Sequence, residues 1–221
     1  MDLEEARLIA HDVHGKLEPA CERIAIAGSI RREAVEVKDV ELVYIPRMIE
    51  TPADLFSTVP APMTEKVIAD LVHDGYWCFD DQVKRNGPKY KRLIHLASGV
   101  VIELFRAQEE NWGLQLVLRT GPAHFNQILV NRMGGVMPVD MKMEDGFLWR
   151  RGIQLETPTE EAFFAELGLP WLEPEERTAK RLWEFLQERR TSYSDKGTLA
   201  EYHDTQPAHP IRKLASRSLS E

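Results

Sequence analysis

A glycine–serine pair followed at a short distance by two alternating acids constrains the fold of this chain more than any other feature. Gly28 and Ser29 follow a short apolar run, residues 22–27, which predicts a strand that ends in a tight turn. Asp39 and Glu41 then open a β-rich run. Alternate residues of a strand point the same way and lie about 6.6 Å apart. We therefore expect both carboxylates on one face of a sheet.

The turn has the composition of a phosphate-binding site. Glycine lets the backbone approach a phosphate, serine offers a hydroxyl and an amide, and the following helix points its N-terminus at the anion. Arg31 and Arg32 come next, and a guanidinium suits phosphate because its fork of donors is planar and always charged. Many ordinary loops share this composition, so the turn indicates phosphate binding only together with other features.

A third acid, Glu103, interrupts the apolar run 100–105. A buried carboxylate is costly without a partner, and a metal ion or an arginine is the natural partner; a structural salt bridge is the alternative. If this strand lies beside residues 39–45, the three acids form a triad. Oxygen ligands without a His or Cys set favour Mg²⁺ or Mn²⁺ over zinc. Two such ions clamp an attacking hydroxyl and a leaving pyrophosphate.

Composition excludes several classes of protein. No apolar run reaches the ~18 residues that span a bilayer, and the acidic start does not resemble a signal peptide. Two cysteines make neither a disulfide framework nor a zinc site, which fits a reducing cytosol. The net charge of −8 argues against nonspecific coating of nucleic acid. We therefore expect a cytoplasmic protein of bacterial, viral or phage origin, with no membrane partner.

One short stretch of the chain is strongly basic and contains no acid. It predicts contact with a nucleic-acid backbone, and a solvated loop is the alternative. Its members are Lys84, Arg85, Lys89, Lys91 and Arg92.

Hydrophobic periodicity predicts helices and strands in a mixed order. Helical patterns cover residues 3–18, a stretch from Thr64, and 111–132 with a break at Thr120-Gly121-Pro122. Short strands are expected at 77–79, 93–96 and 100–105, and a hairpin around 141–149. Residues 47–62, with three prolines, are expected to be loop. This order is typical of an α+β fold.

In combination these motifs resemble the nucleotidyltransferase superfamily and, more narrowly, the family X DNA polymerases, which include DNA polymerase beta. The resemblance covers roughly residues 3–178. The stretches that carry it are Ala27-Gly28-Ser29-Ile30-Arg31-Arg32, Val40-Glu41-Leu42-Val43, Val101-Ile102-Glu103-Leu104, Arg119-Thr120-Gly121, Phe125-Asn126 and residues 160–171.

The resemblance implies a nucleotidyltransferase palm at 1–135, in which a mixed or antiparallel sheet is flanked by helices and a nucleotide-contacting helix is included. A small α+β thumb at 136–190 and a flexible tail at 191–221 would follow. Only 27 residues precede Gly28, so we expect a minimal palm-plus-thumb form without the N-terminal lyase domain of larger relatives.

The resemblance also implies roles for individual residues. Asp39, Glu41 and Glu103 would be catalytic and would hold two Mg²⁺ ions, with Mn²⁺ as a possible substitute. The nucleotide-binding residues would be Gly28, Ser29, Arg32, Thr120, Gly121 and Asn126. The partners would be a nucleoside triphosphate and gapped or primer–template DNA, bound by a monomer.

This chain departs from the family at three places. The family usually has Asp where Glu41 and Glu103 stand, so we expect slower chemistry or an altered metal preference. Leu118 and Arg119 replace an aromatic pair before Thr-Gly, which puts the choice between ribose and deoxyribose in doubt. Val130 replaces a frequent basic residue, which weakens any expectation of high fidelity.

The sequence thus predicts a template-directed DNA polymerase of the X type that fills short gaps in DNA repair. Two alternatives stay open. One is a nucleotidyltransferase that works without a template or on RNA. The other is a nucleic-acid-binding module whose catalysis has lapsed.

Overall fold

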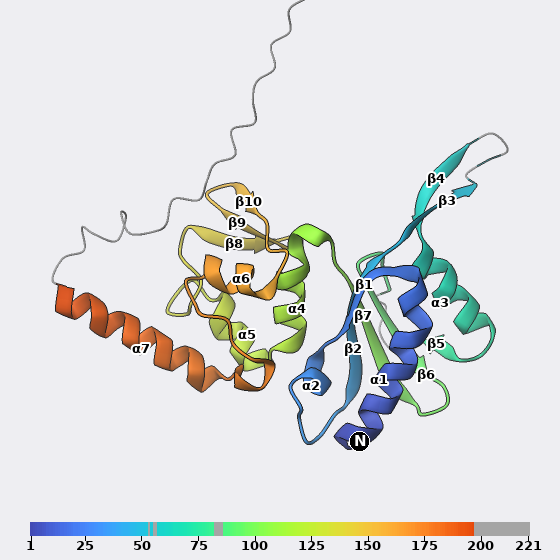
Figure 1. Cartoon of the computed structure of the whole chain (residues 1–221), viewed down its shortest axis with the longest axis horizontal. Helices are drawn as coiled ribbons and strands as arrows, with labels where there is room; N and C mark the ends of the chain where they lie inside the picture. The colour runs from blue at the N-terminus through green and yellow to red at the C-terminus, as the bar shows by residue number, and fades with distance from the viewer. Residues whose placement is uncertain (53, 55–56, 82–85, 197–221) are drawn as a thin grey trace, which may run out of the picture.

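Five strands of the N-terminal half form one mixed sheet, in the order β1-β2-β7-β6-β5. β2 and β7 are parallel neighbours, and the remaining pairs are antiparallel. The strands are β1 (Cys21–Ile26), β2 (Asp39–Pro46), β5 (Trp77–Phe79), β6 (Tyr90–His95) and β7 (Val100–Arg106). This arrangement comes from a computed structural model, which describes residues 1–52, 54, 57–81 and 86–196 (Figure 1).

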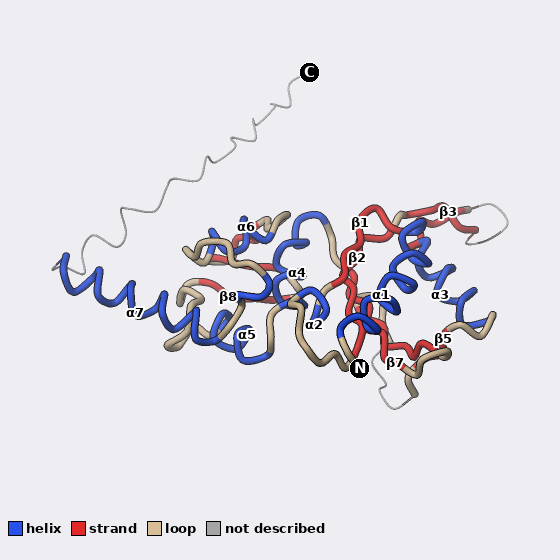
Figure 2. The backbone as a smooth tube through the Cα atoms, turned by 60° about the horizontal axis from the view of Figure 1, so that its bottom comes forward, coloured by secondary structure: helices blue, strands red, loops and turns tan. Residues whose placement is uncertain are grey.

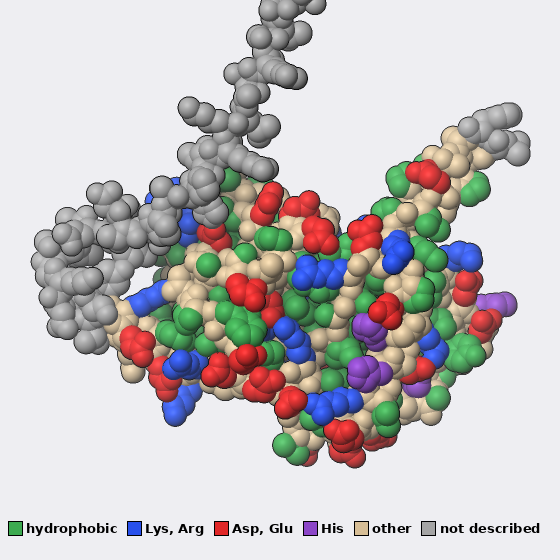
Figure 3. All heavy atoms as spheres, in the orientation of Figure 1, with side chains coloured by type: hydrophobic (Ala, Val, Ile, Leu, Met, Phe, Trp, Pro, Cys, Tyr) green, Lys and Arg blue, Asp and Glu red, His purple; other side chains and the backbone are tan. Residues whose placement is uncertain are grey.

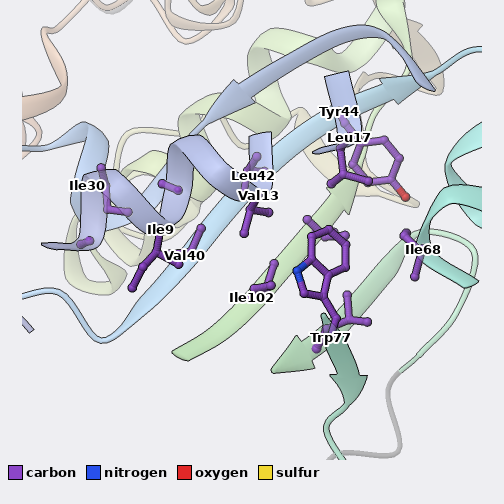
Figure 4. Packing of buried hydrophobic residues seen from close by; sticks show 14 of the residues in the cluster. Ile9, Val13, Leu17, Ile30, Val40, Leu42, Tyr44, Ile68, Trp77 and Ile102 are labelled. Atoms are coloured by element: carbon purple, nitrogen blue, oxygen red, sulfur yellow. The ribbon is translucent and has the colours of Figure 1, made fainter. Parts of the chain in front are cut away.

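Two helices cover one face of this sheet, α1 (Leu3–Leu17) and α3 (Met63–His73). Even-numbered residues of β2 and β7, such as Leu42 and Ile102, pack there against the apolar stripe of α1 and against Trp77 (Figure 4). Because side chains alternate along a strand, the odd-numbered residues point to the opposite face. The acids of β2 and β7 therefore face away from this core.

That opposite face is covered only in part. The buried helix α4 (Trp112–Thr120) packs Trp112 and Leu116 against Val43, Ile45 and Phe105. These residues lie towards the ends of β2 and β7, whereas Asp39 opens β2. The packing of α4 therefore lies away from the start of β2, where Asp39 is found.

The second half of the chain builds its own core around α4 (Figure 2). Leu114 and Val117 of α4 pack with Phe125, Phe163 and Phe164. The elements of this half are α5 (Ala123–Val130), β8 (Met141–Glu144), β9 (Phe147–Arg150), β10 (Ile153–Leu155), α6 (Glu160–Glu166) and α7 (Ala179–Lys196). Three short 3₁₀ turns, η1 (Glu18–Ala20), η2 (Glu109–Asn111) and η3 (Pro174–Glu176), lie at junctions between elements. The predicted α+β class, with a sheet flanked by helices, is confirmed.

One sequence prediction was wrong. The segment 47–62 is not all loop, because β3 (Met48–Pro52) and β4 (Thr58–Pro62) pair as an antiparallel hairpin that extends from the body (Figure 1). Proline lacks an N–H and is tolerated on edge strands. Both strands of a two-stranded hairpin are edges, so the prolines did not prevent pairing. The sequence analysis also did not predict β10, and it placed the strand that corresponds to β6 at 93–96, whereas β6 begins at Tyr90.

The boundary near residue 135 stays a prediction; the second core contains residues from both sides of it. The expected tail begins within α7, which ends at Lys196, and residues 197–221 lie outside the described part. Within the described residues, none of the helices combines the length and apolar character needed to cross a membrane. Acidic and basic side chains are interspersed on the face seen in Figure 3.

Candidate active site

Three acids of β2 and β7 lie on the sheet face opposite α1. In the parallel pairing of these strands, Glu41 is directly opposite Glu103, and Asp39 is two residues before Glu41. The strand with Glu103 thus lies beside β2, which is the condition on which the predicted triad depended. We call these three residues the acid face.

Burial and mutual repulsion raise the pKa of two carboxyl groups on the acid face, Asp39 and Glu41. Burial, together with repulsion from the carboxylates of Asp39 and Glu103, raises the pKa of Glu41 from 4.5 to about 7. Burial and Glu103 also raise the pKa of Asp39, although Arg92 and Arg32 oppose the shift. A carboxylate that retains its proton near neutral pH is short of positive partners. The negative charge of Asp39 and Glu41 is therefore only partly compensated by the neighbouring arginines.

Glu103 differs from the other two acids because it already has two donors. The Tyr90 hydroxyl and the Arg92 guanidinium both donate to its Oε1, each at 2.6 Å. Arg92 also donates from Nε to Asp80 Oδ2 at 2.7 Å. Of the natural partners that the sequence suggested for a buried acid, Glu103 has an arginine.

The donor chemistry of the acid face fits a hard divalent cation. Its carboxylate oxygens are the ligands that Mg²⁺ and Mn²⁺ prefer, and the raised pKa of Glu41 shows that negative charge there lacks compensation. The arrangement of these side chains in space fits a metal site less completely than their chemistry does. Across the described part of the chain, no three His, Cys, Asp or Glu side chains are grouped so as to hold a metal ion. Asp39 and Glu41 are the residues that would hold it, and Glu103 is engaged by Arg92.

The Gly-Ser turn lies directly against the acid strand. Gly28 has a φ of +63°, and a Cβ at this position would come within 2.0 Å of Glu41 Oε2. Only glycine allows this backbone and this approach. The Ala27 amide donates to the Glu41 carbonyl at 2.8 Å. Ser29 Oγ is buried and has no hydrogen-bond partner among the described residues.

The Thr-Gly turn after α4 is bound to the Gly-Ser turn. Arg32 donates to the Thr120 carbonyl, and Arg31 donates to Thr120 Oγ1 at 2.9 Å. Asn126 Nδ2 donates to the carbonyls of Leu118 and Gly121 at 2.7 and 3.1 Å. The predicted nucleotide-binding residues thus form one connected group. Asn126 Oδ1 is buried, and nothing in the described part of the chain donates a hydrogen bond to it.

The basic stretch does not form one patch. Lys84 and Arg85 lie outside the described residues. Lys91 points to the face of α3, where its Nζ pairs with Glu65 Oε2 at 2.9 Å. Arg92 is on the acid face. Lys89 is exposed and donates to the Asp145 carbonyl at 3.3 Å. Alternation along β6 places Lys91 and Arg92 on opposite faces of the sheet, and Lys89 and Arg92 line the cleft described next.

A cleft of about 1240 Å³ opens between β6–β7 and the turn that joins β8 to β9. The turn is tied to the body because the Gly146 carbonyl accepts from Asn111 Nδ2 and Gln115 Nε2, at 3.0 and 3.1 Å. The lining includes Lys89, Tyr90, Arg92, Glu103, Arg106 and Arg119. The acid face thus opens, through Glu103, into a cleft with four basic side chains.

Comparison with known proteins identifies the second half of the chain. Residues 115–178 match the family model described as DNA polymerase beta thumb. Over this segment the chain is similar to the thumb domain of DNA polymerase beta. The match supports the predicted relationship to the X family of DNA polymerases and indicates a polymerase-like, DNA-binding function. No curated protein sequence matches the chain.

A buried ion cluster joins the Gly-Ser turn to the thumb. Glu160, in the first turn of α6, accepts two hydrogen bonds from Arg31, at 2.6 and 2.7 Å, and two from Arg177, at 2.8 and 2.9 Å. Burial alone would raise the pKa of Glu160, but these hydrogen bonds outweigh it and lower the pKa. We call this group the Glu160 cluster. It fixes the turn that carries Ser29 relative to the thumb.

Sequence reasoning missed several residues of the site. It named Arg119 in the Thr-Gly stretch and as a departure from the family but gave it no role. This side chain lies over the Phe105 ring at 3.9 Å, and its Nε is buried with no hydrogen-bond partner among the described residues. Burial lowers the pKa of Arg119, whereas Glu41 and Glu103 raise it. Tyr90 and Asp80 were not singled out. The alternation of β6 was a signal for Tyr90, but it identifies the partner only once the register with β7 is known.

Proposed function

We propose that this protein is a metal-dependent nucleotidyltransferase of the DNA polymerase type, which adds deoxynucleotides to a primer 3′-hydroxyl at short gaps in template DNA. The observation that carries the proposal is the combination of two under-compensated acids, Asp39 and Glu41, with a thumb domain of DNA polymerase beta. The orphan hydroxyl of Ser29 beside them supports a ligand with an anionic oxygen.

Each group has a chemical role in this proposal. Bound Mg²⁺ or Mn²⁺, two ions at Asp39 and Glu41, would neutralise the triphosphate and lower the pKa of the primer hydroxyl. Ser29 donates a hydrogen bond to a phosphate oxygen, and Arg32 adds a guanidinium to the same group. The Thr-Gly turn positions the sugar, and Asn126 Oδ1 accepts from the base or sugar. Lys89 contacts the DNA backbone.

The reaction joins the primer oxygen to the α-phosphorus and breaks the bond to the leaving pyrophosphate. The chain contributes positioning and electrostatics rather than a covalent intermediate, as phosphoryl-type transfers require. The cluster of Glu160, Arg31 and Arg177 maintains the distance between the turn and the thumb that this positioning needs.

One observation favours a second candidate, a DNA-binding module without catalysis. Glu103 is engaged by Arg92 and Tyr90, so an acid face that never obtains a third free carboxylate is the expected structure of a lapsed enzyme. Such a module would bind DNA through the thumb and the cleft and would incorporate no nucleotide.

Incorporation on a one-nucleotide gapped duplex tests the proposal. Each of the four deoxynucleotides and their ribo counterparts is supplied with Mg²⁺ or Mn²⁺. We expect extension that Asp39→Asn reduces by roughly 10³-fold, the scale of losing a group that stabilises developing charge. Glu22→Gln, an exposed acid on the adjacent strand β1, should retain full activity.

The alternatives give different results in this assay. Incorporation that ignores the template base identifies a template-independent transferase. DNA binding without incorporation in either metal identifies the lapsed module. Full activity of Asp39→Asn shows that the acid face is not the reaction site.

A further inference from the structure

The small sheet of the second half, β8 to β10, has one face in the core and one face towards solvent. Met141, Met143 and Leu148 pack into the second core. Because side chains alternate along a strand, Lys142 and Trp149 point to the opposite face. That outer face carries an aromatic ring whose role the proposed function does not explain.

Strand register places three side chains in one row across the outer face. Trp149 of β9 lies opposite Lys142 of β8 and opposite Gln154 of β10. Gln154 is exposed, Trp149 is partly exposed, and 49% of the Lys142 side chain is accessible. We call these three residues the Trp149 row. It combines an aromatic ring with a cation on one side and an amide on the other.

The Trp149 ring is fixed in place before any ligand binds. Its Nε1 donates to the carbonyl of Glu144, the last residue of β8, at 3.3 Å. A ring that is already held loses little conformational entropy when a second ring stacks on it. Every nucleobase has a flat π-face, so stacking on an exposed tryptophan suits single-stranded nucleic acid of any sequence.

The charge beside the ring can be given to a phosphate at little cost. Lys142 Nζ pairs with Glu144 Oε2 at 2.8 Å, and both side chains are about half accessible. Such exposed pairs contribute little to stability. A phosphate that replaces Glu144 as the partner of Lys142 therefore breaks no important contact of the fold.

The Trp149 row continues the wall of the cleft. The turn that joins β8 to β9 (Figure 1) contributes Asp145, Gly146 and Phe147 to the lining of the cleft. Phe147 and Trp149 lie on the same face of β9, about 6.6 Å apart along the strand. A nucleic-acid strand that leaves the cleft across this turn thus reaches Trp149 next.

We propose that the Trp149 row is a binding platform for single-stranded DNA that leaves the cleft unpaired. Trp149 stacks on a base, Lys142 contacts a phosphate, and the Gln154 amide bonds to the edge of a base. The inference rests on the proposed function only for the presence of DNA in the cleft, and it needs no catalysis.

Binding of a short labelled oligothymidylate, followed by fluorescence anisotropy, tests the platform without any measurement of activity. A blunt duplex serves as the second ligand. The variants are Trp149→Leu, Trp149→Phe and Lys142→Gln. Trp183→Leu is the matched control, because Trp183 is a 43% exposed tryptophan on α7. Thermal melting checks that each variant is folded.

We expect Trp149→Leu to weaken binding of the single strand roughly tenfold, the scale of losing one base stack. Trp149→Phe, which keeps an aromatic ring, should retain most of the affinity, and Trp183→Leu all of it. The blunt duplex should bind equally to wild type and Trp149→Leu.

Salt dependence separates the role of Lys142 from that of Trp149. Lys142→Gln should reduce the slope of log K against log salt by about 0.7, the value for one phosphate contact on a single strand. Trp149→Leu should leave the slope unchanged, because stacking releases no counterions.

Several results would overturn the platform. One is Trp149→Leu that binds the single strand like wild type, and another is an equal loss for the single strand and the duplex. Self-association that Trp149→Leu abolishes, without single-strand binding by wild type, would assign the face to a second copy of the chain. If Trp149→Leu does not fold, an unchanged salt slope in Lys142→Gln contradicts the proposal.

The failure of this proposal is distinguishable from failure of the proposed function. Wild type that extends a gapped duplex but binds the single strand no better than Trp149→Leu keeps the function and loses the platform. Wild type that extends no primer but binds the single strand through Trp149 keeps the platform and loses the polymerase activity.

Discussion

The pKa values of two glutamates that are withdrawn from solvent, Glu41 and Glu160, are shifted in opposite directions. Glu41, on the acid face, has a pKa raised to about 7, whereas the pKa of Glu160, in the cluster that joins the turn to the thumb, is lowered. Glu160 is buried and Glu41 is half-buried, and burial by itself would raise the pKa of both. The difference lies in their neighbours: Glu41 faces Asp39 and Glu103, and Glu160 accepts four hydrogen bonds from two arginines.

This contrast separates a structural acid from one that awaits a ligand. Burial of a charge costs free energy that only partners offset. The Glu160 cluster contains its own partners and contributes to the geometry of the fold. On the acid face, neighbouring positive charges offset only part of the free-energy cost of burying the carboxylates, which is common at functional sites. Predictions about these two glutamates should therefore have opposite signs.

The largest expected effect is at Glu160. Replacement by Gln leaves Arg177, whose side chain is 0% exposed, without a counter-charge. We expect the free energy of unfolding at pH 7 to fall by about 3–5 kcal/mol, as when one partner of a buried ion pair is removed. Urea denaturation followed by circular dichroism measures it. Glu184→Gln, at an acid whose side chain is 40% accessible and is paired with Arg181, should change stability by less than about 1 kcal/mol.

The pH dependence of this difference has a definite sign. The pKa of Glu160 is lowered by folding, so its contribution is present above the ordinary carboxyl range and is lost as pH falls through the folded-state pKa. Wild type and Glu160→Gln should converge in strong acid. A difference that stays constant down to low pH means that the loss comes from packing rather than from charge.

The second largest expected effect is a gain in the free energy of unfolding when Glu41 is replaced. Because folding raises its pKa from the ordinary value of 4.5 to about 7, the folded state retains a proton that the unfolded chain has lost between these values. Stability of the wild type thus decreases as pH rises from about 4.5 to about 7. Glu41→Gln should be more stable by about 2 kcal/mol at pH 8 in metal-free buffer, and unchanged near pH 4.

Thermal and urea unfolding in the presence of a chelator, at pH 4 and pH 8, measure the gain at Glu41. The same variant should lose the activity proposed for the site, since stability and function oppose each other at strained sites. A loss of stability at pH 8 means that Glu41 already has a sufficient partner, and then the contrast with Glu160 does not hold.

The smallest effect concerns the helix that carries Glu160. Thr159 caps α6, and its Oγ1 accepts from the Ala162 amide at 3.2 Å. Thr159→Ala should lower the free energy of unfolding by about 1 kcal/mol. If the cap acts by positioning Glu160, this cost should shrink in a Glu160→Gln background. Asp2→Ala, which removes the cap of α1, is the control and should add independently.

The local pattern of apolar and polar residues was enough to predict much of the fold. It predicted the apolar stripe of α1, the strand that leads into Gly28, and the placement of Asp39 and Glu41 on one face of a strand. Such patterns reflect the periodicity of the helix and the strand, which backbone geometry sets. The resemblance added a thumb, predicted at residues 136–190, and residues 115–178 match the family model described as DNA polymerase beta thumb. Pattern failed at β3 and β4, where prolines suggested a loop, because edge strands tolerate residues that central strands exclude.

The sequence did not indicate which side chains form ion pairs with the site residues. Lys91 and Arg92 are adjacent in the chain, yet one pairs with Glu65 and the other with Glu103. Arg31 was read as a phosphate ligand, but it binds Glu160, which is 129 residues away. Such contacts depend on how strands and helices meet, and spacing along the chain does not specify that.

The sequence by itself determined which residues are acids, which alternate on a strand, and where the chain must turn at Gly28. Those properties follow from backbone stereochemistry and hydrophobic period, which act over a few residues. Only the tertiary structure decided that Glu103 faces Glu41 and that Arg92 already holds it. The register between strands sets those distances, and distance and burial decide whether a carboxylate is a structural ion pair or an open site for a cation.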